Sequence, residues 1–287
     1  MIDRETRMKL LNLDQLPTLP EIIIRVLQTI DDEDSSATDL GAILEQDHVI
    51  TARILRLANS AFYGFPTQVD SVQRAIVLIG YNEVRMLALA TSVFDTFRQL
   101  RQYALDPHDF WLHALGAAKA AALISADMRG ICSPQSCFTA GLLHDMGKYA
   151  LATVLQKTYK NIVADAQKRN VPLKDSEQVT LNTTHAEVGA WLAEQWCFPE
   201  TLRKPIADLY AYQNSNSHHP DTLVVALADS ISRLAKFGTA GDPADPSIDE
   251  SLLASLRMSQ EKVEQYLNTV KAHLENAEAL LDILNGE

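Results

Sequence analysis

Apolar residues recur along most of the chain at the spacing of one face of a helix, in short runs that end at turn or capping residues. The first run, residues 19–30, begins at Pro20, which the first helical turn tolerates, and ends in an acidic cluster. Ser36, Asp47 and Ser71 are suited to cap the helices that follow them. We therefore expect short amphipathic helices over residues 40–44, 49–58, 72–79 and 82–97.

The same periodicity continues through the second half of the chain. Pro107 and Asp109 begin a helix predicted over residues 110–126. The last run, 259–284, carries one apolar stripe, and we expect it to pack on its own lobe rather than to form a dimer helix. Further helices are predicted over residues 138–148, 151–169, 183–196, 223–231 and 250–256. The periodicity as a whole predicts an all-α protein of about a dozen helices.

Length and charge exclude several classes of partner. The 287 residues, 47% of them hydrophobic, can bury one large core or two smaller ones, and we expect two packed helical lobes. The net charge of −12 opposes binding to nucleic acid or an anionic membrane, because such binding needs a basic face and the sequence shows none. No apolar run approaches the ~20 residues of a bilayer span, and residues 1–13 are too charged for a secretory signal. We therefore expect a cytoplasmic protein.

The three cysteines indicate neither a disulfide framework nor a metal site. Cys132, Cys137 and Cys197 match no Cys-x-x-Cys spacing, so a cysteine-based zinc site is not expected. We interpret them as small buried apolar residues in a reducing compartment.

The candidate chemistry centres on residues 138–148, where an apolar run predicted to be helical delivers His144 and Asp145 side by side. Neighbouring side chains on a helix point about 100° apart, so a single ion must sit between them and other helices must supply its remaining ligands. Imidazole and carboxylate suit Zn, Fe, Mn or Ni, whereas more carboxylate and water favours Mg or Mn. Taken alone, the doublet is more simply a polar pair under a loop. Other histidines and an aspartate favour the metal site.

Each of these other residues also has a structural explanation. His113 lies on an apolar, alanine-rich face, where a histidine is more often a hydrogen-bonded core residue than a ligand. His185, in the first turn of its helix, is equally consistent with exposure and ligation, and His218 and His219 close a polar loop. Asp229 is the least easily explained, because a buried carboxylate in an apolar helix needs a cation, a salt bridge or hydrogen bonds.

Three ordered segments carry a resemblance to a known family: LPTLPEIIIRVL, DLGAILEQDHVITARILRLANSAFYG and SVQRAIVLIGYNEVRMLALA. They resemble the HDOD family, the HD-related output domains of bacterial signalling proteins, over roughly residues 13–234. The resemblance implies an all-helical fold of two packed lobes, the second related to HD-type metal phosphohydrolases. We expect the N-terminal lobe over residues 1–104, the HD-like lobe over 105–238, and a helical extension packed on the core over 239–287.

The order of the candidates is similar to the HD superfamily pattern of a histidine, a His-Asp doublet and a distal aspartate. The resemblance implies that His113, His144, Asp145 and Asp229 hold one divalent transition-metal ion, Fe, Mn, Zn or Ni. Lys148 falls where the superfamily keeps a phosphate-facing cation, although a lysine at a helix end also complements the helix dipole. If the protein is an enzyme, Asp145 and Lys148 are its expected catalytic residues.

The remaining histidines resemble the extra ligands of two-metal HD phosphodiesterases. His185, His218 and His219 would serve a second ion, with Asp145 as the bridge. Cyclic-dinucleotide phosphodiesterases of this superfamily carry a glutamate and a Gly-Tyr-Pro loop after the double histidine, whereas this chain continues with Pro220 and has no such loop. Recognition of cyclic dinucleotides is therefore not expected.

Three functions fit these observations. The resemblance favours a signal-transduction output module, non-catalytic or weakly catalytic, which binds a signalling protein or a small-molecule ligand as a monomer or weak dimer. The alternative is a metal-dependent phosphohydrolase, either a phosphodiesterase or a nucleotidase. A di-iron redox or gas sensor is the third. We also expect Phe62 and Tyr63 to pack near the second lobe and to couple its metal site to a partner-facing surface.

Overall fold

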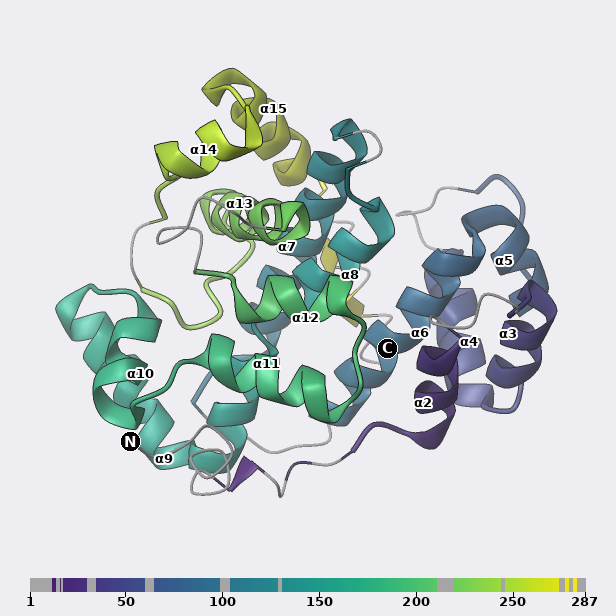
Figure 1. Ribbon diagram of the computed structural model, residues 1–287, viewed down its shortest axis with the longest axis horizontal. Coiled ribbons are helices and arrows are strands. Elements are labelled where there is room, and N and C mark those ends of the chain that lie inside the picture. The colour runs from purple at the N-terminus through teal and green to yellow at the C-terminus, as the bar shows by residue number, and fades with distance from the viewer. Residues whose placement is uncertain are drawn as a thin grey trace.

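The regular structure of the chain is helical wherever the structure describes it, which confirms the all-α prediction (Figure 1). The computed structural model describes residues 12–13, 16, 18–29, 35–59, 65–98, 104–128, 131–210, 219–243, 246–273, 277–278 and 281–282. Phe62, Tyr63 and His218 lie outside these residues.

The N-terminal helices pack together on α6 (Tyr81–Arg98), which lies between them and the rest of the molecule (Figure 1). Ser36 closes a capping box at the start of α3, and Asp47 and Ser71 accept hydrogen bonds from backbone N–H groups of α4 and α5. The capping residues expected from the sequence therefore begin these helices. The other helices of this part are α2 (Glu21–Gln28), α3 (Ala37–Leu44), α4 (His48–Ala58) and α5 (Val72–Ile79).

The second part is built around α7 (Pro107–Asp127), a largely buried helix against which α8 and α13 pack. Small residues permit this close approach. A Cβ atom at Gly116 would lie 2.3 Å from the hydroxyl of Ser232 on α13, and one at Gly141 would lie 2.9 Å from a backbone oxygen of α7. The remaining helices here are α8 (Pro134–Leu143), α9 (Met146–Arg169), α10 (Leu173–Leu181), α11 (His185–Gln195), α12 (Glu200–Ala207) and α13 (Pro220–Leu234).

Aromatic side chains join the two parts into one core. Phe94 of α6 lies 4.5 Å from the ring of Trp111 on α7, and Phe97 lies 5.2 Å from Tyr149 on α9. Offset and tilted aromatic pairs of this kind stabilise beyond the area they bury. The contact surface between the two groups of helices is therefore apolar and continuous with the core of α7.

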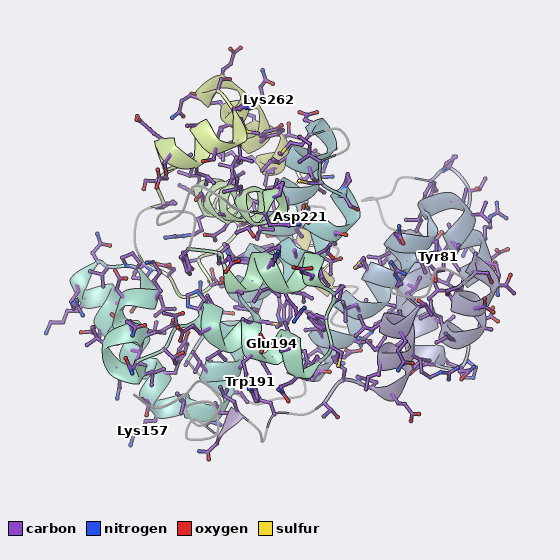
Figure 2. All side chains as sticks on the ribbon, in the orientation of Figure 1. Tyr81, Lys157, Trp191, Glu194, Asp221 and Lys262 are labelled. Carbon is purple, nitrogen blue, oxygen red and sulfur yellow. The ribbon has the colours of Figure 1, made fainter. Side chains whose placement is uncertain are left out.

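The C-terminal helices α14 (Glu250–Leu256) and α15 (Gln260–Lys271) lie against α13 and α7 (Figure 1). Tyr266 donates a hydrogen bond to Asp127, and Lys262, labelled in Figure 2, forms an ion pair with the same carboxylate. The sequence predicted one helix over residues 259–284. In the structure this helix, α15, already ends at Lys271.

Within the described residues, no single helix has both the length and the apolar character needed to cross a membrane. A bent pair, Val72–Ile79 with Val84–Arg98, meets these criteria only when its two helices are taken together.

Candidate metal centre

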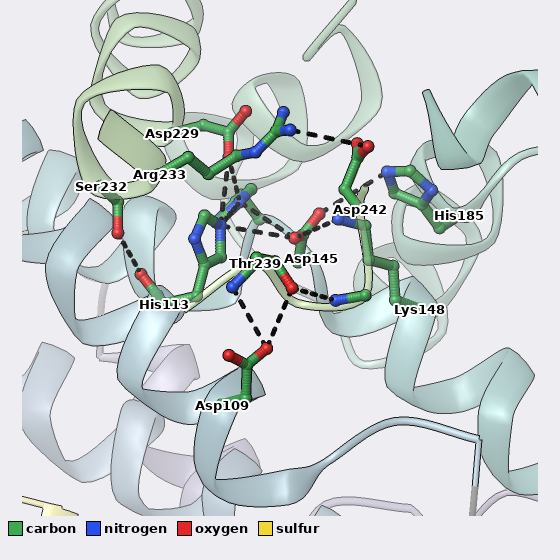
Figure 3. Close-up of polar contacts among 12 residues, drawn as sticks. Asp109, His113, Asp145, Lys148, His185, Asp229, Ser232, Arg233, Thr239 and Asp242 are labelled. Carbon is green, nitrogen blue, oxygen red and sulfur yellow. Dashed lines mark hydrogen bonds and ion pairs between the residues drawn. The ribbon is translucent and has the colours of Figure 1, made fainter. Parts of the chain in front are cut away.

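Side chains from three separated parts of the chain converge beneath α13 (Figure 3). His113 comes from the buried middle of α7, His144 and Asp145 from the junction of α8 and α9, and Asp229 from α13. Both histidines are fully buried, and Asp145 is 1% exposed. The structure therefore brings together all four residues of the first predicted ligand set.

The ligand atoms of these residues face one another. Nε2 of His113 lies 3.4 Å from Nε2 of His144 and 3.1 Å from Oδ1 of Asp229. Oδ2 of Asp145 lies 3.3 Å from Nε2 of His144 and 3.7 Å from Nε2 of His113. Metal–ligand bonds of ~2.1 Å at tetrahedral angles separate the ligand atoms by about 3.4 Å. The ligand atoms of His113, His144 and Asp145 all lie within 4.8 Å of one another and suit a single transition-metal ion, and Oδ1 of Asp229 adjoins both histidines.

The backbone at the His-Asp doublet differs from the continuous helix expected from the sequence. α8 ends at Leu143, His144 is its C-terminal cap, and α9 begins at Met146. Asp145, between them, has φ −98° and ψ 9°, outside the helical range. This break lets two adjacent side chains point towards one ion, which neighbouring positions of an uninterrupted helix do with more difficulty.

A second layer of contacts orients the doublet. Nδ1 of His144 lies 2.7 Å from the carbonyl oxygen of Gly141, so its N–H donates there and Nε2 is left for a metal. Lys148, itself 2% exposed, donates to Oδ2 of Asp145 at 2.7 Å. Nδ1 of His113 and Oδ1 of Asp145 are buried and have no hydrogen-bond partner in the part of the chain that is described.

The pKa shifts of Asp145 and His144 both favour positive charge within the cluster. Burial opposes ionisation of Asp145, but the charges of His144 and Lys148 outweigh burial and hold the pKa of this carboxyl well below its usual range. Burial likewise lowers the pKa of His144, yet the charges and hydrogen bonds of Asp145 and Asp229 raise the pKa of this imidazole to about 10. A proton on His144 therefore takes the place that a metal cation would fill.

His185 lies on the other side of Asp145, within a separate buried network. Its Nε2 lies 3.6 Å from Oδ1 of Asp145 and 2.9 Å from the hydroxyl of Tyr210, and its Nδ1 lies 2.6 Å from Glu177. Glu177 also accepts a hydrogen bond of 2.5 Å from Tyr159. Both ring nitrogens of His185 are thus engaged by protein groups.

Glu177 is the buried residue that sequence reasoning missed. It is fully buried, and its carboxylate receives the backbone N–H of His185 as well as the imidazole. One signal existed in the sequence, because Leu173, Glu177 and Leu181 stand at intervals of four and hence on one helical face. An acid between two leucines on that face is a candidate for a buried hydrogen-bonded role.

His219 is not brought to the cluster of His113, His144, Asp145 and Asp229. His218 lies outside the described residues, and His219 precedes α13, where its Nδ1 lies 3.5 Å from Asp221. Ten residues separate His219 from Asp229, which is about 15 Å along a helix. Coordination of a second metal ion by His218 and His219 stays a prediction.

The connection after α13 folds back across the centre (Figure 3). Thr239 donates its backbone N–H and its hydroxyl to Asp109 on α7, and Arg233 lies 3.7 Å from Asp242. A cavity of about 260 Å³ lies against this connection. Its lining includes Gln167, Arg233, Thr239, Gly241, Asp242, Pro243 and Pro246.

Comparison with solved structures shows the same fold in other bacterial proteins. An HDOD domain protein of unknown function from Geobacter sulfurreducens is 26% identical, with a TM-score of 0.81, and the match covers 98% of this chain and 99% of that chain. A protein from Marinobacter aquaeolei VT8, named "Putative signal transduction protein", is 23% identical with a TM-score of 0.78, over 99% of this chain and 62% of that one. A protein from Shewanella amazonensis SB2B, named "Putative phosphohydrolase", is 23% identical with a TM-score of 0.75, over 96% and 97% of the two chains.

Sequence comparison places the chain in one family. An uncharacterised protein of Treponema pallidum (strain Nichols) is 25% identical over 277 residues, which cover 92% of this chain and half the length of that relative. The family model for the HDOD domain matches residues 16–212, more than half of the chain. This match agrees with the resemblance seen in the N-terminal segments and with the buried His/Asp cluster. The chain therefore belongs to the HDOD domain family.

Proposed function

We propose that this chain is a signal-transduction output module whose HD-type centre holds one transition-metal ion. The observation that carries the proposal is the buried cluster of His113, His144 and Asp145, whose ligand atoms lie 3.3–3.7 Å apart, with Asp229 at 3.1 Å from His113. Two histidines and two carboxylates fit Fe, Mn, Zn or Ni. The role in signalling rests on membership of the HDOD family.

One ion fits this chain better than two. The second ion of the expected pair would need His185, but Glu177 and Tyr210 occupy both of its ring nitrogens. His219 would also have to leave Asp221, far from Asp229 along α13. We therefore assign His185 to the network of Glu177 and Tyr210 beside the centre rather than to a second ion.

Burial of the centre supports an output role over efficient catalysis. A hydrolase must admit a phosphate ester to the metal, whereas both histidines here are fully buried and Asp229 is 15% exposed in its side chain. A buried ion instead stabilises one arrangement of the helices that hold it, as metal binding does whenever the folded state alone binds the ion. The partner of such a module would be a signalling protein or a small-molecule ligand that distinguishes this arrangement.

A metal-dependent phosphohydrolase is the second candidate, and two features favour it. Lys148 contacts Asp145 and could face a phosphate, and the cavity beside Arg233 offers room next to the centre. A bound ion would lower the pKa of a water molecule and polarise a phosphoryl oxygen. His113, His144, Asp145 and Asp229 would hold that ion, while Lys148 would hold the phosphate oxygens.

One set of samples tests both candidates. Protein expressed in metal-replete medium and purified without chelator should contain about one equivalent of Fe, Mn, Zn or Ni at this centre, and His113→Ala should remove it. His108→Ala is the matched control, since His108 lies on the same helix and is exposed. Substoichiometric metal in the parent protein would refute the metal centre.

The same samples decide between module and enzyme. With bis(p-nitrophenyl) phosphate and a cyclic dinucleotide, we expect little or no turnover by the metal-loaded protein. Robust hydrolysis that Asp145→Asn abolishes and His108→Ala leaves intact would make the phosphohydrolase the primary function. Anomalous scattering from crystals at the absorption edge of the metal would place the ion between His113 and Asp229.

A further inference from the structure

The start of α13 faces the start of α8 at a second cluster of metal-binding side chains, apart from the His/Asp centre. Cys132 precedes α8, Cys137 lies in its first turns, and Asp221, labelled in Figure 2, lies in the first turn of α13. A sulfur atom of each cysteine and an oxygen of Asp221 all lie within 4.8 Å of one another. Cys137 and Asp221 are 84 positions apart in the chain, yet Sγ of Cys137 lies only 3.6 Å from Oδ1 of Asp221.

His219, which directly precedes α13, lies beside the other oxygen of Asp221. Its Nδ1 lies 3.5 Å from Oδ2 of Asp221 and, within the described part of the chain, has no hydrogen-bond partner although it is buried. Thiolates and carboxylates are ligands that tetrahedral zinc accepts. We propose that Cys132, Cys137 and Asp221 form a second metal site, one that binds zinc. This proposal does not depend on the proposed function of the His/Asp centre.

The charge on Asp221 supports a cation at this place. Asp221 is 4% exposed, and in the described residues its polar neighbours are the thiol of Cys137 and the imidazole of His219. A buried carboxylate without a full countercharge is costly. A divalent ion would bond directly to this carboxylate and to the two thiolates that form when it binds.

The thiol of Cys137 donates a hydrogen bond to Asp221 in the metal-free protein. The hydrogen bond with Cys132, burial and the charge of Asp221 all raise the pKa of Cys137. Without a metal, Cys137 is therefore a protonated donor to Asp221 and a poor nucleophile for disulfide exchange. Zinc binding would release these thiol protons.

The zinc site and the His/Asp centre share two helices. α8 carries Cys137 near its start and leads into His144 seven residues later, and α13 carries Asp221 and Asp229 eight residues apart. At 1.5 Å per residue, the two sites lie about 10–12 Å apart along both helices. A zinc ion would therefore hold α8 and α13 together at one end while the His/Asp centre holds them at the other.

Cobalt substitution shows which of the two sites binds metal. A thiolate ligand to Co²⁺ produces a near-ultraviolet charge-transfer band, and the sulfur-free His/Asp centre cannot produce this band. In reduced protein loaded with Co²⁺, we expect this band in the parent, in His144→Ala and in Cys197→Ser, whose cysteine is exposed. Cys132→Ser, Cys137→Ser and Asp221→Asn should each lose or strongly weaken it. Absence of the band from the parent, or its survival in both Cys132→Ser and Cys137→Ser, would overturn the proposal.

A second measurement uses the unmodified sequence and does not require the variants to fold. An organomercurial should react with the exposed Cys197 and also with Cys132 and Cys137. Modification of the latter two thiols should release one zinc ion from zinc-loaded protein. Zinc release without thiol modification, or thiol modification without zinc release, would contradict the site. A Cys132–Cys137 disulfide that persists in reductant would likewise refute it.

Discussion

Nε2 of His113 and Nε2 of His144 lie 3.4 Å apart, although 31 residues separate them in the chain. Nδ1 of His144 donates to Gly141, so the two imidazoles meet through the nitrogens that a metal would use. Side by side in a fully buried site, such nitrogens would repel each other as cations. A single cation between the two rings, either the proton of His144 or a metal ion, therefore suits this arrangement.

Loss of either histidine should remove the stabilisation that metal provides. For the parent, we expect metal at about 1,000 times its Kd to raise the free energy of unfolding by about 4 kcal/mol. His113→Ala and His144→Ala should each abolish this increment. The double variant should lose no more of it, because both act on one ion. Denaturant unfolding with and without added metal measures the effect, and two additive losses would show that the histidines bind separate ions.

The increase in the free energy of unfolding that metal binding produces should grow with pH. Because the pKa of His144 is raised from 6.5 to about 10, its proton stabilises the metal-free fold fully below pH 6.5 and is lost as pH rises towards 10. Metal binding requires the neutral imidazole, so it competes with that proton at low pH and is favoured at high pH. Thermal unfolding at several pH values, with and without metal, checks the sign. If the stabilisation by metal instead fell between pH 6.5 and about 10, the assigned protonation of His144 would be contradicted.

Glu177→Gln should destabilise the protein although no metal ligand is changed. The carboxylate of Glu177 receives the imidazole and backbone N–H of His185 and the hydroxyl of Tyr159, and an amide cannot satisfy all three donors. We expect a loss of about 1–3 kcal/mol. Glu264→Gln on α15, where the side chain is exposed, is the control and should change stability by less than about 0.5 kcal/mol. Equal stability of both variants would remove Glu177 from this network.

Gly147→Ala should disturb the approach of α9 to α11. A Cβ atom at Gly147 would lie 1.9 Å from the carbonyl oxygen of His185, which is backbone and cannot rotate away. We expect a destabilisation of about 1–3 kcal/mol or more, together with weaker metal binding, because Asp145 and Lys148 flank this position. Gly41→Ala meets only the flexible side chain of Gln73 at 3.1 Å and should be tolerated. Normal stability of Gly147→Ala would mean that the two helices can separate at little cost.

Much of the helical fold could be predicted from the sequence, because helix starts depend on local information, whereas the ligand set was implied by the resemblance to the HD superfamily. Ser36, Asp47 and Ser71 satisfy backbone N–H groups within a few residues of themselves, so they mark helix starts without knowledge of the rest. Asp229 stands out for a similar reason, since a carboxylate inside an apolar helix needs a compensating partner wherever the helix packs.

The partners themselves depend on contacts between distant segments, which only the tertiary structure decides. The chain breaks between α8 and α9 at His144 and Asp145, where the local apolar pattern predicted a continuous helix. Glu177 became a partner of His185 because α10 packs on α9 beside α11.

The cysteines illustrate the same limit. Their spacing predicted three buried apolar residues and no metal site, but Cys197 is exposed, and α13 brings Asp221 to Cys132 and Cys137. A sequence determines which side chains can bind a metal and which helices will form. The packing of those helices, set by small residues such as Gly116 and Gly141, determines which of these side chains share one site.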